Sequence, residues 1–152
     1  MQEKIYVHYG HKRFDPTAFN EIKNRMFVKP DGGLWASDIN AEYGWKNWCK
    51  DNDFRECNED NSFKFKLKQG SKILELKSKK DLIGLPMENI PYKFSWYTLD
   101  FEQLKQNYDA IEVYIDELYF DLYGWDCDSL LVLNKECIEL IEERRRKYEN
   151  KL

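Results

Sequence analysis

A glycine-containing turn that leads directly into a tryptophan-containing apolar run constrains this sequence most. Asp31-Gly32-Gly33 precedes Leu34-Trp35-Ala36-Ser37-Asp38, and the aromatic segment Tyr43-Gly44-Trp45-Lys46-Asn47-Trp48-Cys49 follows, so that three of the five tryptophans lie within fourteen residues. Glycines let the backbone approach another group closely, and wide flat rings suit a planar ligand. The same pattern is also typical of a strand and an aromatic helix that pack in the core.

Length and composition limit what the chain can be. Its 152 residues suit a single domain spanning 1–152 with a core of its own. The net charge of −4 gives no overall signal for binding nucleic acid or an anionic membrane. No apolar run approaches the roughly 20 residues of a membrane span, and the N-terminus lacks the apolar block of a signal peptide. We therefore expect a cytoplasmic protein with no membrane partner.

The four cysteines are Cys49, Cys57, Cys127 and Cys137, and none forms a C-x-x-C pair. The two histidines, His8 and His11, do not lie at zinc-ligand spacing from them. We therefore expect free, mostly buried thiols in a reducing compartment and no metal.

Hydrophobic periodicity predicts an α+β fold. Strict alternation of apolar residues and lysines over 62–68 predicts a half-buried strand, and the turn at 69–71 predicts a hairpin with a strand over 72–77. The other strands are expected over 4–10, 34–37, 110–115 and 129–133; helices are expected from Pro16 to Met26, over 42–50, from Asp100 to about 107 and over 135–149, with a loop over 29–33.

Three groups of side chains could carry chemistry, and each has a plain structural alternative. The lysines of 62–68 could bind an acidic partner, or they could be the solvated side of an edge hairpin. Asp126 and Asp128, two apart in extended backbone, could bind a metal, stabilise a cation or act as a base, or they could simply form a turn. His8 could be a ligand-binding group or a satisfied structural histidine.

Taken in order along the chain, these motifs resemble the ADP-ribosyltransferase superfamily, especially its branch similar to diphtheria toxin and the poly-ADP-ribose polymerases. The first family element is His-Gly-Thr or His-Gly-Ser, the second is like Gly-Ile-Tyr-Phe-Ala-Asp followed by Asn-Tyr-Cys, and the third is an acidic residue that begins a strand. The matching segments here are His8-Tyr9-Gly10, Gly33-Leu34-Trp35-Ala36-Ser37-Asp38, Asn47-Trp48-Cys49 and Asp128-Ser129-Leu130-Leu131-Val132. The segment Tyr108-Asp109-Ala110-Ile111-Glu112 also resembles a strand that precedes the third element.

The resemblance implies two small, packed, mainly antiparallel sheets around an NAD cleft, with flanking short helices. NAD is then a substrate, and a macromolecular target, protein or nucleic acid, receives a single ADP-ribose. The residues implied in NAD binding are His8 at a ribose hydroxyl, the backbone of Tyr9 and Gly10 with Ser37 at the carboxamide, and Trp35, Tyr43 or Trp48 against the nicotinamide ring. Asp126 or Asp128 supplies the carboxylate that stabilises the positive charge on the ribose, which with His8 completes the expected catalytic set.

The chain departs from the family pattern at three positions. Tyr9 replaces a glycine, Trp35 replaces a tyrosine, and the acid is Asp instead of Glu. The expected activity is accordingly mono-ADP-ribosylation by a monomeric bacterial or phage effector or toxin. Two alternatives are a non-catalytic module that binds a protein or nucleic acid, and a nuclease that uses Asp126 and Asp128 with a divalent ion.

Overall fold

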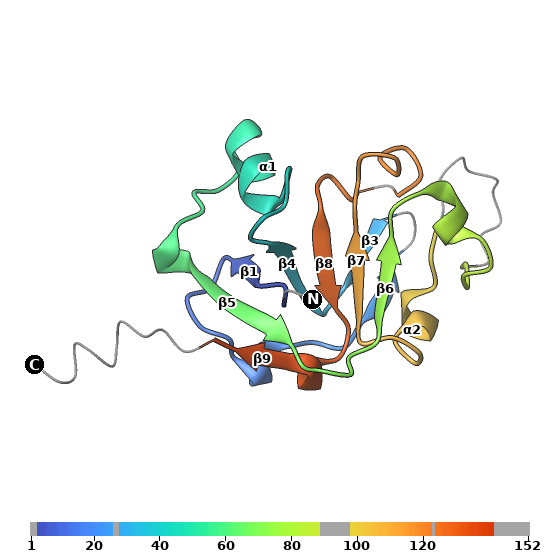
Figure 1. Ribbon diagram of the computed structural model, residues 1–152, viewed down its shortest axis with the longest axis horizontal. Coiled ribbons are helices and arrows are strands. Elements are labelled where there is room, and N and C mark those ends of the chain that lie inside the picture. The colour runs from blue at the N-terminus through green and yellow to red at the C-terminus, as the bar shows by residue number, and fades with distance from the viewer. Residues whose placement is uncertain (1–2, 26–27, 89–97, 123, 142–152) are drawn as a thin grey trace, which may run out of the picture.

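The computed structural model shows a mixed α+β fold that is mostly sheet (Figure 1). It describes residues 3–25, 28–88, 98–122 and 124–141. The strands are β1 (Tyr6–Tyr9), β2 (Lys23–Arg25), β3 (Val28–Asp31), β4 (Leu34–Asp38), β5 (Ser62–Leu67), β6 (Ile73–Leu76), β7 (Ala110–Val113), β8 (Ser129–Val132) and β9 (Ile138–Leu140). The α-helices are α1 (Trp45–Asp51) and α2 (Phe101–Leu104), and the 3-10 helices are η1 (Pro16–Ala18), η2 (Glu59–Asn61), η3 (Lys79–Leu82) and η4 (Lys135–Cys137).

Seven strands form one mixed sheet in the order β6-β7-β8-β4-β1-β5-β9, and β2 and β3 form a second, two-stranded sheet. β6 and β7 pair in parallel, and the other neighbouring strands described here pair antiparallel. β4 joins the two halves of the large sheet, because its residues 34–36 pair with β8 whereas Ser37 and Asp38 pair with β1. Figure 1 shows β5 and β9 running at a steep angle to β6, β7 and β8.

Each face of the large sheet carries its own hydrophobic cluster. The larger cluster lies under β6, β7 and β8 and includes Trp125 and residues of α2 and η3. The smaller cluster joins the two halves of the sheet through Tyr6, Ala36, Phe65 and Leu130. As expected, Ala36 is buried and Leu34 packs against this second cluster.

The strand predicted from strict alternation is confirmed as β5. Phe63, Phe65 and Leu67 all face the smaller cluster, while the lysines of β5 face the other way. The predicted cap of α2 is also present, because the Asp100 carboxylate accepts a hydrogen bond from the Gln103 amide at 3.1 Å. α2 ends at Leu104, earlier than expected.

The predicted hairpin of 62–68 with 72–77 is wrong. β6 pairs in parallel with β7, so that β5 and β6 lie far apart in the sheet order. β5 is an interior strand between β1 and β9, and its lysines therefore do not guard a sheet edge. Alternation of apolar and polar residues identifies a strand but not the strand that pairs with it. The short turn at 69–71 therefore suggested a pairing of β5 with β6 that does not occur.

The helix expected from Pro16 is wrong, and the loop expected over 29–33 is wrong for 29–31, which belong to β3, whereas Gly32 and Gly33 do form a turn. Asp15 caps a 3-10 helix that ends at Ala18, and the chain then enters β2 and β3. The glycines of the 31–33 turn explain this path. A Cβ at Gly32 would lie 2.1 Å from the Glu21 carbonyl oxygen, so the close approach that they permit is to the chain itself.

The final helix expected over 135–149 is wrong where it can be examined. Residues 135–137 form η4, and Ile138–Leu140 form β9 against β5. Residues 142–149 lie outside the described residues, as does Met26 at the end of the first expected helix. Within the described part of the chain, no helix combines the length and apolar character needed to cross a membrane.

Candidate functional site

Ser37 links three elements at one end of the large sheet. Its hydroxyl donates to the carbonyl oxygen of Asp128 at 3.0 Å and accepts from the amide of Trp45, the first residue of α1, at 2.8 Å. The side chain is buried because α1 lies directly over it: an added Cβ at Gly44 would be 3.1 Å from the Ser37 Cβ. Figure 1 shows α1 and the β7–β8 connection at the same end of the sheet. Ser37 therefore fixes where both lie.

Asp128 is the better fixed of the two expected carboxylates. Its Oδ1 accepts the Ile115 amide at 2.9 Å, and its own amide donates to the Tyr43 carbonyl at 2.9 Å. Burial raises the pKa of this carboxyl above its usual range, and the Ile115 hydrogen bond opposes the rise. Asp126 is half-buried, and its carboxylate forms no hydrogen bond with the described residues.

The hydrogen bonds of His8 define its tautomer. Nδ1 lies 2.7 Å from the carbonyl oxygen of Trp35, which only accepts, so Nδ1 carries the hydrogen. Nε2 lies 3.0 Å from Nδ1 of His11. Burial lowers the pKa of His8, and the charges of His11 and Arg55 lower it further, against the effect of the Trp35 carbonyl. A neutral His8 therefore presents Nε2 as an acceptor.

Gly10 continues the chain beside His8 in a conformation that other residues rarely adopt, with φ +121°. A Cβ at this position would lie 2.6 Å from Nη1 of Arg55 and 3.8 Å from Nε2 of His8. The missing side chain thus leaves room for a guanidinium next to the histidine. Arg55 also lies over the ring of Phe54, with its Cζ 5.5 Å from the ring centroid.

The aromatic residues of the opening motif form two contacts. Trp35 meets Trp125 edge-on at 4.8 Å between ring centroids. Trp45 stacks on Trp48 at 5.2 Å and 15°, with Phe54 against both. Trp35, Trp45 and Trp48 are all half-buried, so none of them is sealed in the core. Tyr43 donates its hydroxyl hydrogen to Asp51 at 2.8 Å.

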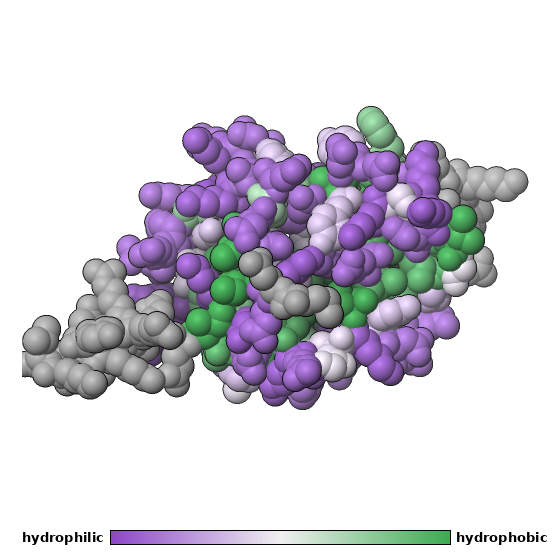
Figure 2. Space-filling view, in the orientation of Figure 1, coloured by the Kyte–Doolittle hydropathy of each residue, from purple (hydrophilic) through white to green (hydrophobic). Residues whose placement is uncertain are grey.

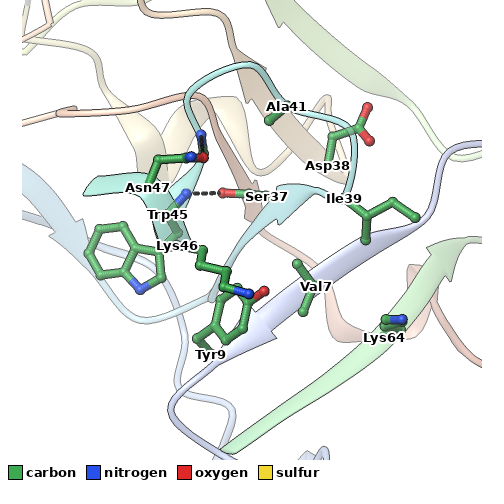
Figure 3. A pocket seen from close by; sticks show the side chains of 11 residues that line it. Val7, Tyr9, Ser37, Asp38, Ile39, Ala41, Trp45, Lys46, Asn47 and Lys64 are labelled. Carbon is green, nitrogen blue, oxygen red and sulfur yellow. Dashed lines mark hydrogen bonds between the residues drawn. The ribbon is translucent and has the colours of Figure 1, made fainter. Parts of the chain in front are cut away.

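A pocket of about 370 Å³ opens beside α1, a volume suited to a small-molecule site (Figure 3). In Figure 3 the side chains of Trp45, Lys46 and Tyr9 lie on one side of it, and those of Val7, Ile39 and Lys64 lie on the other. Ser37 and Asp38 also contribute to its wall. Lys46 and Lys64 outnumber Asp38 among the charged residues of the lining, and this favours an anionic ligand group.

The expected site residues fall on both faces of the sheet. Val7 pairs with Lys64 and with Ser37, so this face of β1 carries the pocket. His8 pairs with Phe63 and points to the opposite face, where the two rings lie 5.0 Å apart. From the resemblance in sequence, His8 and Ser37 were both expected to contact the same NAD molecule. The structure connects them through β4, whose Trp35 carbonyl accepts from His8.

Three cations near these residues were missed by the sequence analysis: Lys29, Lys46 and Arg55. Lys29 lies in a segment read as a loop, and Arg55 in a polar segment with no motif. Lys64 was noted among the lysines of 62–68, which could either bind an acidic partner or form the solvated side of an edge hairpin. The net negative charge of the chain gave no indication of these cations near the expected site residues.

Among the described residues, no cluster of three or more metal-ligating side chains occurs. The four cysteines are free thiols, and three of them are buried. On the face seen in Figure 2, hydrophilic side chains predominate around a narrower band of hydrophobic ones. Comparison with known proteins found no matching family model, curated protein or solved structure.

Proposed function

We propose that this protein is a mono-ADP-ribosyltransferase that transfers ADP-ribose from NAD to a macromolecule and releases nicotinamide. The observation that carries the proposal is the convergence on β4 of the three motifs. His8 bonds to the Trp35 carbonyl, and Ser37 bonds to both α1 and Asp128. Segments 8–10, 45–49 and 126–128 thus each contact segment 34–38, and these contacts support the proposal.

The charges of this region suit the parts of NAD. The pocket carries Lys46 and Lys64, which match the negative pyrophosphate, and the aromatic rings of Trp35, Trp45 and Trp48 match the flat nicotinamide. On the face of β1 opposite this pocket, the neutral His8 has an acceptor nitrogen for a ribose hydroxyl, which would take the place of its present bond to His11.

Asp128 is the carboxylate that we assign to the reaction. The bond between the ribose C1′ and the nicotinamide nitrogen breaks, its electron pair leaves with nicotinamide, and the ribose gains positive charge. A fixed carboxylate stabilises such a charge without having to reorganise. Asp128 is fixed by Ile115 and Tyr43, whereas Asp126 is not held by the described residues. A nucleophile of the target then attacks C1′.

A macromolecular target is favoured by exposed aromatic residues on the β7–β8 connection, which leads to Asp126 and Asp128. Tyr119 and Phe120 are 56% and 82% exposed and meet edge-on at 5.2 Å. Exposed aromatic pairs of this kind are common at protein interfaces. The same surface would serve the alternative, a non-catalytic module that binds a partner.

The test is nicotinamide release and transfer of radiolabelled ADP-ribose to proteins and nucleic acids of a host extract. Asp128→Asn keeps an oxygen that accepts from Ile115 but removes the charge, and Asp126→Asn is the matched control. We expect Asp128→Asn to lower nicotinamide release by about a hundred-fold, similar to the loss of one electrostatic stabilising group elsewhere. Asp126→Asn should lower it much less.

Binding is measured separately, since a ligand that binds the native state raises its melting temperature. No nicotinamide release together with no rise in melting temperature on adding NAD would contradict the proposal. A rise without any release would favour the non-catalytic module. Loss of activity in Asp126→Asn alone would move the carboxylate assignment to Asp126.

A further inference from the structure

Lys29 of β3 places its ammonium between two tryptophans. Nζ lies 5.1 Å from the ring centroid of Trp35 and 5.4 Å from that of Trp45. Both distances fall within the roughly 6 Å range of a cation–π contact. These rings come from β4 and α1, so three separate elements meet at this ammonium.

No carboxylate of the described residues lies within ion-pair distance of this ammonium, since the ion pairs formed there involve other cations. The stem of Lys29 passes Gly124, where an added Cβ would be 3.6 Å from the lysine Cγ. The two aromatic rings therefore supply the main attraction for the charge. The two rings therefore form a cation-binding site, and the Lys29 side chain of the protein itself occupies this site.

The surroundings suit a positive charge beyond the two rings. Burial raises the pKa of the Cys127 thiol to about 11. The charge of Lys29 lowers this pKa, and the charges of Asp126 and Asp128 raise it. The ammonium and the two expected carboxylates are thus gathered around one residue. A cation between Trp35 and Trp45 has the negative charges of this loop nearby.

We propose that Trp35 and Trp45 form a binding site for a flat aromatic cation, an N-substituted pyridinium, and that Lys29 occupies this site in the free protein as a built-in competitor. The inference rests on the proposed function for the identity of the ring, since the nicotinamide of NAD is such a cation. It goes beyond that function by making ring binding conditional on the departure of Lys29. The flexible four-carbon stem of lysine allows this departure without any change in the sheet.

The competition has a measurable size. A site that its own side chain fills for about nine-tenths of the time binds another ligand about ten-fold more weakly than an open site. Removal of the ammonium should therefore strengthen binding of a pyridinium cation about ten-fold. The occupied fraction acts on every ligand of the site alike, so neutral nicotinamide should gain by a similar factor. It has a similar ring but no fixed charge, so it should bind more weakly than the cation in both proteins.

The experiment measures binding of 1-methylnicotinamide, a pyridinium cation, and of nicotinamide by calorimetry. The variant is Lys29→Met, which keeps a long apolar stem, and the matched control is Lys23→Met on the neighbouring strand β2, where the lysine is exposed. About ten-fold tighter binding of the cation by Lys29→Met, with Lys23→Met unchanged, supports the inference. Equal affinity of wild type and Lys29→Met for the cation, binding of nicotinamide as tight as that of the cation, or no binding of the cation at millimolar concentration overturns it.

A second measurement uses the wild-type protein, so a folding defect of Lys29→Met does not prevent the test. Acetylation of individual lysines is followed by mass spectrometry with and without 1-methylnicotinamide. The cation should expel Lys29 and speed its acetylation, while Lys23 stays constant. No change at Lys29 when the cation is bound contradicts the inference. Cation binding without NAD turnover would refute the proposed function alone, and NAD turnover without any effect of Lys29 would refute this inference alone.

Discussion

The buried carboxylate of Glu112 on β7 makes a stability prediction that can be worked out from its contacts. Its side chain is 6% exposed, and Oε1 lies 2.7 Å from Nζ of Lys4. The hydroxyl of Tyr114 donates to the same oxygen at 3.0 Å and also lies against the Lys4 ammonium. Lys4 precedes β1 and Glu112 belongs to β7, so the ion pair ties together strands that are not neighbours in the sheet.

Removal of Lys4 leaves this carboxylate without its cation. The loss of one partner from a fully buried pair costs about 3–5 kcal/mol. The Lys4 side chain is 40% exposed, so water reaches the pair from that side, and fully exposed pairs contribute about 0–1 kcal/mol. We therefore expect Lys4→Met to lower the free energy of unfolding by about 2 kcal/mol, between these limits. For a chain of this size that corresponds to a melting temperature lower by about 4–8 °C.

A double-mutant cycle isolates the pair. The measurement is urea unfolding followed by tryptophan fluorescence for Lys4→Met, Glu112→Gln and the double variant. A real pair gives a coupling of about 1 kcal/mol or more, since the double variant buries no unpaired charge. Lys77→Met is the control, because Lys77 also lies over the Tyr114 ring but pairs with Glu75 at the surface. A coupling below about 0.3 kcal/mol, the scatter expected of independent sites, would refute this reasoning.

Three further predictions concern pH and backbone geometry. The stability of the protein should fall as the pH rises above about 10, as measured in alkaline titrations followed by circular dichroism. Burial alone would lower the pKa of Lys4, but its hydrogen bonds and the nearby Glu112 charge raise it, and burial raises the pKa of Tyr6. Both groups therefore stabilise the fold below their ordinary pKa values of 10.5 and 10.0 and lose that effect at higher pH. Gly32→Ala should prevent folding or lower the melting temperature far more than Gly70→Ala. An added Cβ at Gly32 would lie 2.1 Å from a backbone carbonyl oxygen, whereas at Gly70 it meets nothing within 4 Å and costs about 1–2 kcal/mol of backbone strain. Equal effects of the two substitutions in thermal melts would contradict the close approach at Gly32. Nicotinamide release should decline only below pH 6.5, because burial lowers the pKa of His8 and its neutral form is the acceptor; a midpoint above pH 6.5 in the pH–rate profile would argue against this role.

Local patterns in the sequence were sufficient to predict several elements. The alternation through Phe63, Phe65 and Leu67 identifies β5 and its buried face, since side chains of a strand alternate between faces. The Asp100 cap identifies the start of α2, because the signal and the hydrogen bond lie within four residues. β1, β4 and α1 were predicted on similarly local grounds, each within a few residues of its observed bounds.

Pairing between distant segments could not be predicted. Nothing in the sequence of β6 shows that its partner is β7, 37 residues further on in their register. Ile138–Leu140 is too short for its alternation to outweigh the helical spacing of the segment that follows, so β9 was taken as a helix. In both cases tertiary contacts decided between conformations that the local sequence permits.

The candidate site shows the same division. Its motif residues could be picked out because they lie in short recognisable motifs, and the structure shows that His8, Trp45 and Asp128 contact β4, whereas their role in NAD binding stays a prediction. Lys29 and Arg55 were missed, because each lies in a segment without periodicity and reaches the site only through the fold. A cation held by aromatic rings leaves no spacing signal, since the rings come from separate elements.

β4 explains why the opening motif matters for both the fold and the site. Trp35 and Ser37 lie on one face of this strand and Ala36 lies on the other, since side chains alternate. A shift of one residue in its register would therefore bury Trp35 and Ser37 among the residues of the smaller cluster and would turn Ala36 toward α1. The close contact of Gly32 with the backbone at Glu21, together with the amide bond of Gly33 to the Asn20 carbonyl at 2.9 Å, fixes where β4 begins and so prevents this shift. The two glycines thus act on the site at a distance, by setting the register of the strand on which His8, α1 and Asp128 converge.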